Sequence, residues 1–165
     1  GVEIKNFDAF LRETILDRKL QPLHGEFDFI LLDCPPNLSR VTVNALVACQ
    51  EAIGPIEAQP YSIKAISDLT NTVALIRSRL DRGVTLRFLP TKIDSRLKAA
   101  NEILGAVEGG LKDRVLPRVR TDANLVRAPM QNAPIAFCYP NSKAAKDYAR
   151  LADQLLREEA PTDHA

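Results

Sequence analysis

The chain has 165 residues, of which 45% are hydrophobic and 26% charged, a composition typical of an ordinary globular protein with room for one domain and its core. Its 22 basic and 21 acidic residues give a net charge of +1, which excludes a strongly basic nucleic-acid binder on bulk charge but leaves room for a local basic patch. The three cysteines are odd in number and widely spaced, which indicates no disulfide framework and makes a reducing cytoplasm the simpler setting. No apolar run approaches the roughly 20 residues of a membrane span, so the composition does not indicate a transmembrane protein.

The first two predicted elements lead to a candidate site. Apolar residues recur at helical spacing over 6–20, which predicts an amphipathic helix. The apolar run 27–32 then ends at Asp33 and two prolines, which predicts a strand buried on both faces of a parallel sheet. Asp33 is therefore expected at the carboxyl end of a strand, where open α/β sheets bind ligands and where a carboxylate can hold magnesium. The alternative is an Asp that merely begins a turn.

Helices and strands alternate through the rest of the chain. We predict helices over 39–50, from Ser62 or Ser67 to 80, over 95–107, near 122–127 and over 142–158, strands over 52–56, 84–90 and 115–119, and an extended stretch over 134–139. This order predicts an α/β fold with a mostly parallel sheet and helices on both faces. We expect one domain over 1–159 and a frayed tail over 160–165.

Several motifs in a fixed order carry a resemblance to a known family. They are Asp33-Cys34-Pro35-Pro36, Thr42-Val43-Asn44-Ala45-Leu46, Pro55, Tyr61-Ser62, Ala128-Pro129, Pro134-Ile135 and the segment from Tyr139 to Tyr148. Together they resemble the second half of a ParA/Soj-type partition ATPase of the MinD-like deviant Walker P-loop class. The segment 139–148 is similar to the family's closing YDPKSKGAxxY segment, and the likeness runs from about Phe7 to Leu156. Asn132 replaces a frequent glycine of the family, and an asparagine can still adopt a left-handed turn.

The resemblance implies a fold, an activity and partners. The fold is a three-layer P-loop NTPase-like domain, incomplete at its N-terminus. The activity is that of a cytoplasmic ATPase that uses ATP and Mg²⁺, dimerises around two nucleotides and binds DNA without sequence preference. The partner is a ParB-like centromere-binding protein that stimulates the ATPase, and no membrane is involved.

The resemblance also implies roles for particular residues. The position of Asp33 helps to hold the magnesium ion and its waters in the family. Pro35 and Pro36 belong to the switch that senses the terminal phosphate. The segment with Pro117, Arg118 and Arg120 lies near the adenine and the adjoining surface. For both arginines, a solvated surface pair is the alternative to contact with nucleotide or DNA.

The glycine-rich loop of the family does not occur in this sequence. None of the seven glycines lies in a GxxxxGK(S/T) or KGGxGK(S/T) pattern, whose backbone N–H groups and lysine would hold the phosphates. In the family this loop lies ahead of the residues present here, and the chain begins with Gly1 rather than Met, so we expect a preceding segment to be missing. Because phosphoryl transfer depends on positioning and charge stabilisation, we expect these 165 residues not to hydrolyse ATP, and we expect an exposed sheet edge.

Other polar residues have two interpretations. Asp94 is expected to cap the helix that follows it, with nucleotide contact as the alternative. Cys34 is expected to be a buried, inert thiol. The resemblance makes basic residues on the late helices candidates for DNA backbone contact, and the residues that could form such a basic face are Lys92, Arg96, Lys98, Lys143, Lys146 and Arg150. Acids at Asp147, Asp153 and Glu158 interrupt the last helix, so a mixed-charge solvated face is the alternative for that helix.

Three functions follow from these observations. The first is a plasmid or chromosome partitioning ATPase whose phosphate-binding loop is absent from this chain. The second is a non-catalytic interaction module that keeps the fold. The third is a MinD-like positioning protein, which the acidic end of the final helix disfavours because an anionic membrane surface would repel it.

Overall fold

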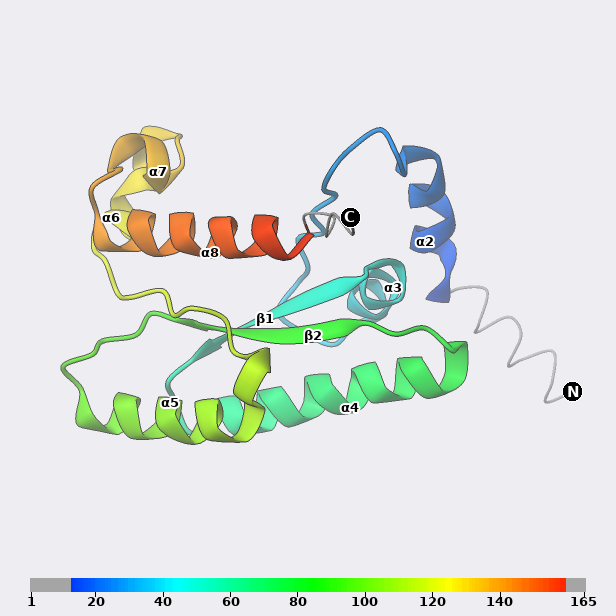
Figure 1. Ribbon diagram of the computed structural model, residues 1–165, viewed down its shortest axis with the longest axis horizontal. Coiled ribbons are helices and arrows are strands. Elements are labelled where there is room, and N and C mark those ends of the chain that lie inside the picture. Colours follow the sequence, from blue (N-terminus) through cyan, green and yellow to red (C-terminus); the bar gives the residue numbers. More distant parts are fainter. Residues whose placement is uncertain (1–12, 160–165) are drawn as a thin grey trace, which may run out of the picture. The chain divides into compact units, whose positions relative to one another are not determined.

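The computed structural model describes residues 13–159 (Figure 1). Their contacts separate into two compact units. Unit 1 comprises Gly1–Ala52 and Ser67–Leu86, and unit 2 comprises Ile53–Ile66 and Arg87–Ala165. We describe each unit by itself, and the expectation of a single domain stays a prediction. Among residues 13–159, no helix has the length and hydropathy that a bilayer span requires.

Two helices of unit 1 pack against each other, namely α2 (Ile15–Leu20) and α3 (Arg40–Ala48). A short 3₁₀ turn, η1 (Gln21–Leu23), follows α2 and contains Pro22. The predicted helix over 6–20 is confirmed for its second half, while its first half lies outside the described residues. The helix predicted over 39–50 is confirmed with slightly narrower bounds, and its Ala45, Leu46 and Val47 are buried.

An ion pair anchors α2 within unit 1. The guanidinium of Arg82 lies 2.8 Å from a carboxylate oxygen of Asp17, whose side chain is buried. The same guanidinium donates a hydrogen bond to the backbone carbonyl of Val47 in α3, at 3.4 Å. Arg82 therefore connects the two helices to the residues that follow the long helix α4 (Ser62–Leu80).

The predicted strand over 27–32 is wrong. Apart from one bridge between His24 and Phe27, this run forms no ladder, and residues 29–35 are irregular. Its apolar side chains are exposed: Phe27 by 59%, Phe29 by 49% and Leu31 by 90%. A strand needs a neighbour to pair its N–H and C=O groups, and among residues 13–159 none lies beside this run. The apolar side chains of this run are therefore exposed on an unpaired segment.

The sheet contains two parallel strands, β1 (Glu51–Glu57) and β2 (Thr85–Thr91), connected through the long helix α4 (Ser62–Leu80). The Thr85 N–H donates to the Gln50 carbonyl at 2.9 Å, and the Thr91 hydroxyl donates to the Ile56 carbonyl at 3.3 Å. Both contacts join residues 35 positions apart, so the two strands run in the same direction. The predicted strands over 52–56 and 84–90 and the helix between them are confirmed.

Unit 2 contains the remaining helical elements. They are α5 (Lys98–Leu111), η2 (Lys112–Arg114), α6 (Asn124–Arg127), η3 (Ala128–Gln131), α7 (Ile135–Cys138) and α8 (Lys143–Glu159). The helices predicted over 95–107, near 122–127 and over 142–158 are confirmed with shifted ends. Asn132 has φ 49° and ψ 35°, so the expected left-handed turn is also confirmed.

The extended stretch predicted over 134–139 is wrong, because most of it is the short helix α7. The N–H groups of Phe137 and Cys138 both donate to the Pro134 carbonyl, at 3.0 and 3.2 Å. A proline just before a helix needs no N–H partner and has a φ already suited to the turn. Pro134 therefore begins a helical turn here.

The segment 115–120 runs beside β2 without becoming a regular strand. Parallel bridges join Phe88 to Val115 and Ile93 to Arg120. Between them, the N–H of Leu116 donates to the Phe88 carbonyl and that of Val119 to the Pro90 carbonyl, each at 2.8 Å. Pro117 has no N–H and so cannot continue the ladder. The predicted fourth strand is thus present only as two bridges.

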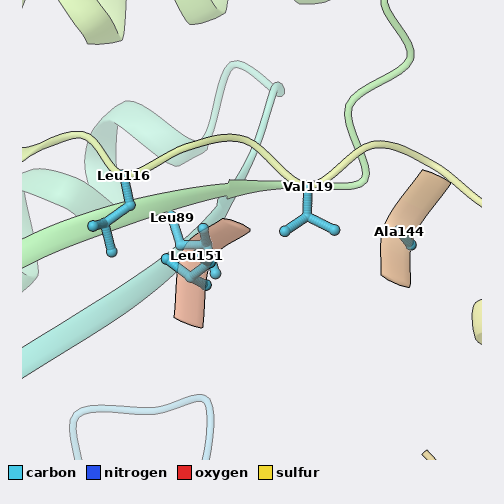
Figure 2. Close-up of a cluster of buried hydrophobic side chains, with 5 residues drawn as sticks. All are labelled: Leu89, Leu116, Val119, Ala144 and Leu151. Atoms are coloured by element: carbon cyan, nitrogen blue, oxygen red, sulfur yellow. The ribbon is translucent and has the colours of Figure 1, made fainter. Parts of the chain in front are cut away.

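Side chains alternate across β2 to form the core of unit 2. Figure 2 shows the buried cluster on the α8 side, formed by Leu89, Leu116, Val119, Ala144 and Leu151. On the α5 side, Pro90 and Ile93 line a small cavity together with Ile103, Leu104 and Val107. Within unit 2, α5 and α8 lie on opposite sides of β2 (Figure 1). This arrangement confirms an α/β fold with helices on both faces of a parallel sheet.

Candidate functional site

The carboxylate predicted to hold magnesium, Asp33, lies in unit 1 on the irregular segment 29–35. Its side chain is exposed, as are Pro35 and Pro36 beside it. Among residues 13–159, no three His, Cys, Asp or Glu side chains lie close enough together to hold a metal ion. Magnesium prefers six oxygen ligands, so Asp33 alone does not make a metal site. The described residues supply one carboxylate, and the other ligands would have to come from phosphate and water.

The thiol next to Asp33 is exposed, so the prediction that Cys34 is buried is wrong. Its sulfur donates only a long contact of 3.6 Å to the Leu32 carbonyl, because the unpaired run provides nothing to cover it. The more buried thiol of unit 1 is Cys49. Burial, helped by the nearby Cys34 and Glu51, raises the pKa of Cys49 to about 11, which makes it a poor nucleophile at neutral pH.

The other three predicted binding residues, Pro117, Arg118 and Arg120, lie together in unit 2 on the segment beside β2. Arg118 is exposed, and Pro117 and Arg120 are half-buried. The predicted residues thus form two groups, Asp33 with its prolines in unit 1 and these three in unit 2.

Arg120 is held by a buried carboxylate on α8. Its Nε and Nη2 atoms donate to the two carboxylate oxygens of Asp147, each at 2.8 Å, and its backbone N–H donates to the same carboxylate at 3.0 Å. The Asp147 side chain is 1% exposed and that of Arg120 is 38% exposed. The Arg120 guanidinium lowers the pKa of Asp147 and keeps it ionised. The mixed-charge solvated face that was the alternative for this helix is wrong at Asp147, because the helix turns this side chain inward.

A second acid, Asp122, links the same segment to α8. One of its oxygens accepts from the Asn124 N–H at 2.9 Å, and the other accepts from the Ala144 N–H at 3.1 Å. These N–H groups lower the pKa of Asp122. The Ser142 hydroxyl accepts a further bond from the Ala145 N–H at 3.2 Å. Asp122 was missed in the sequence, although an Asp two residues before a helical turn is a common capping pattern.

Asp94 does not cap α5, whose N-cap is Leu97. Instead its carboxylate accepts from the backbone N–H and the guanidinium of Arg96, the latter at 2.9 and 2.7 Å. These bonds lower the pKa of Asp94 to about 2, and the bond from the Arg96 side chain contributes most, followed by that from the Arg96 backbone. The charge of Lys143 contributes to the same shift. The charge at the start of α8 therefore acts on the loop before α5 within unit 2.

Some of the predicted basic residues form ion pairs among the described residues, and others do not. The Lys92 ammonium lies 2.5 Å from Glu57, and that of Lys98 lies 3.9 Å from Glu102. Lys143, Lys146 and Arg150 are exposed, and no ion pair involving them occurs within residues 13–159.

Two acids of α8 have other partners and so do not offset the charge of these cations. Asp147 is buried against Arg120, and Glu158 is bonded to Arg87 and Gln154. Asp153 is exposed, and no bond of this kind to it occurs among the described residues. The exposed surface of α8 is therefore more basic than the sequence indicated.

Comparison with known proteins gives a consistent result. A family model described as "AAA domain" matches residues 1–86. The chain is 31% identical over 163 residues to the chromosome partitioning protein ParA of Myxococcus xanthus, covering 98% of this chain and 58% of the relative. It is 31% identical over 157 residues to the sporulation initiation inhibitor protein Soj of Bacillus subtilis, covering 94% and 62%. The chain thus spans about three-fifths of the length of these curated relatives.

Solved structures share the fold. Cobyrinic acid a,c-diamide synthase from Mycobacterium smegmatis with bound ADP and magnesium has a TM-score of 0.72 and 28% identity, covering 89% of this chain and 54% of that one. A Cyanothece McdA variant in complex with ATP has a TM-score of 0.77 and 18% identity, covering 90% and 59%. The second likeness concerns the fold alone.

Proposed function

The chain belongs to the AAA-domain family as a ParA/Soj-type member, and on that basis we propose that it is part of an ATPase that partitions DNA. The observation that carries the proposal is the continuous match, over 94–98% of the chain, to proteins named for chromosome partitioning or as Soj. The cargo, plasmid or chromosome, stays open. We place the protein in the cytoplasm, with a ParB-like centromere-binding protein and a second copy of itself as partners.

The nucleotide site of this proposal is only partly contained in the 165 residues. Asp33 would contribute a magnesium-side carboxylate, and Pro35 and Pro36 would contact the terminal phosphate. The segment with Pro117, Arg118 and Arg120 would lie near the adenine and the adjoining surface, with Arg118 on that surface. The sequence has no glycine-rich loop to hold the phosphates, so we propose that these residues bind no ATP tightly by themselves and do not hydrolyse it.

The role of Arg120 in the proposal is mainly to position its segment. Its guanidinium is engaged by Asp147 on two sides, which fixes the segment 115–120 against α8. More than a third of the side chain remains exposed, so an outer N–H can still reach a phosphate. Arg120 therefore combines a structural bond with a place at the surface.

DNA binding in the proposal depends on exposed cations of unit 2. Lys143 and Lys146 at the start of α8 are exposed, and Lys143 lies close enough to Asp94 to lower its pKa. Binding without sequence preference needs only neutralised phosphates and no contact with base edges. Each such contact releases counterions, so the affinity falls steeply as salt rises.

Retention of the chain on immobilised duplex DNA tests this proposal. We expect retention on two unrelated sequences with equal affinity, and a loss of affinity when the salt concentration is raised from low to physiological. No retention at low salt would contradict the DNA-binding part of the proposal. Preference for one sequence would contradict it as well.

A further inference from the structure

An open groove in unit 2 is lined by residues of α5, η2, the segment beside β2 and α8. Its volume is about 420 Å³, and its lining consists of Glu108, Lys112, Val115, Leu116, Pro117, Arg118, Arg150 and Gln154. This volume is in the range of roughly 300–1,000 Å³ that is usual for ligand sites. The groove lies entirely within one unit, so its shape depends only on contacts inside that unit.

The groove carries an excess of positive charge. Lys112, Arg118 and Arg150 come from three different elements, are all exposed, and face one acid, Glu108. Within residues 13–159 no ion pair occupies any of these three cations. Two acids lie three residues from Arg150 on its own helix: Asp147, which is already bound by Arg120, and Asp153, which is exposed and is not part of the groove lining. Three cations are therefore available to a ligand, and two are guanidinium groups that suit carboxylates.

The backbone at Lys112 is held in a conformation unusual for a residue with a side chain. Its φ is 48° and its ψ is −120°, a region that favours glycine. Such strain is retained where the surrounding structure holds it, and it is concentrated at binding sites. Here it lies at the turn that follows α5 and places a lysine on the groove.

We propose that this groove binds an acidic, partly apolar peptide segment of a partner protein. Charge complementarity is the main argument, because three unpaired cations surround the hollow. The apolar Val115 and Pro117 in the lining can receive an apolar side chain between two carboxylates of the peptide. Peptide N–H groups can donate to Glu108 and to the Gln154 amide oxygen.

Duplex DNA fits this mixed lining less well. A DNA backbone presents phosphates and sugars, so Glu108 in the lining would repel it and Val115 and Pro117 would gain little. Pro117 has no N–H, so a partner cannot continue a regular strand ladder here, and recognition must depend largely on side chains. DNA binding at this groove is therefore an outcome that the experiment has to separate from the proposal.

The test uses a fluorescein-labelled peptide of alternating Glu and Leu, beside the same peptide with Gln in place of Glu. Binding to the full chain is followed by fluorescence anisotropy at low and high salt. We expect saturable binding of the Glu peptide only, weakened by salt. Arg118→Glu and Arg150→Glu should each weaken it about tenfold or more. The matched control Arg157→Glu, an exposed position on the same helix as Arg150, should leave it unchanged.

Three outcomes would overturn the proposal. The first is no saturable binding of the Glu peptide at millimolar concentration. The second is equal binding of the Glu and Gln peptides, or equal loss with Arg157→Glu. The third is that unlabelled duplex DNA displaces the peptide and that Arg118→Glu and Arg150→Glu also weaken the binding of the chain to DNA. That result would assign the groove to DNA. Circular dichroism of each variant shows whether it is folded, and Arg118→Gln and Arg150→Gln give a milder pair for the same comparison.

Discussion

Arg120 and Asp147 form a forked ion pair that joins the segment beside β2 to the buried face of α8. Two guanidinium nitrogens lie 2.8 Å from the two carboxylate oxygens, and the Arg120 N–H adds a third bond at 3.0 Å. The carboxylate is almost fully buried, while the guanidinium reaches the surface. One residue thereby holds the end of the core segment and keeps part of its charge exposed.

Removal of either partner should destabilise unit 2. Asp147→Ala leaves the Arg120 N–H without its acceptor, which should lower the free energy of unfolding by about 2 kcal/mol. Arg120→Ala should lower the free energy of unfolding by more than Asp147→Ala does, because this substitution leaves a buried carboxylate without its cation. Urea denaturation measures both. If the double variant is no more stable than the sum of the single variants predicts, the pair is not coupled as described.

Asp122 should contribute to the stability of α8. Asp122→Ala removes the acceptor for the N–H groups of Asn124 and Ala144, and we expect a loss of about 1 to 2 kcal/mol. Asp153→Ala, on the exposed surface of α8, is the matched control and should change stability little. Equal effects of the two substitutions in thermal denaturation would argue against the capping role.

Acid should destabilise the protein through these carboxyls. The pKa values of Asp147 and Asp122 are lowered from the ordinary value of 3.8, so their contribution to stability is present above that value and is lost as the pH falls through the folded pKa. Asp94, with a pKa of about 2, is paired with an exposed arginine, so solvent screening leaves it little weight in the stability of the fold. Unfolding free energy should therefore decline between about pH 4 and pH 2. Asp147→Asn should show a shallower decline, and an unchanged pH profile would contradict this assignment.

DNA affinity should depend on the start of α8. Lys146→Glu replaces an exposed cation with an anion and should weaken duplex binding and reduce its salt dependence. Arg157→Glu makes the same change of charge at the other end of that helix and should have a smaller effect. Anisotropy of a labelled duplex measures both. A larger loss with Arg157→Glu would place the DNA surface elsewhere.

Periodicity predicted the long helices of this fold well, because α4, α5 and α8 each bury one regular stripe. It failed at 27–32, where the apolar content of a strand is present but no described strand lies beside it to pair its backbone. Pro134 was taken as part of an extended run, although a proline also suits the first turn of a helix. These differences depend on neighbours and on local turn geometry, which the residue pattern alone does not contain.

The candidate site was predictable only in part. Motif order pointed to Asp33 and to the segment with Arg118 and Arg120, whose roles stay predictions, and it did not show that Arg120 has a buried partner. Asp147 looked like a solvated acid because charged residues surround it in the sequence. Its inward orientation follows from its helical phase beside the buried Ala144 and Leu151.

The most direct test of the account is titration of the 165-residue chain with a fluorescent ATP analogue in the presence of Mg²⁺. We expect no saturable binding in the micromolar range, because Asp33 is exposed and none of the seven glycines lies in a phosphate-loop pattern. Saturable micromolar binding that Asp33→Ala abolishes would contradict it, because the chain would then build a complete triphosphate site from its own residues.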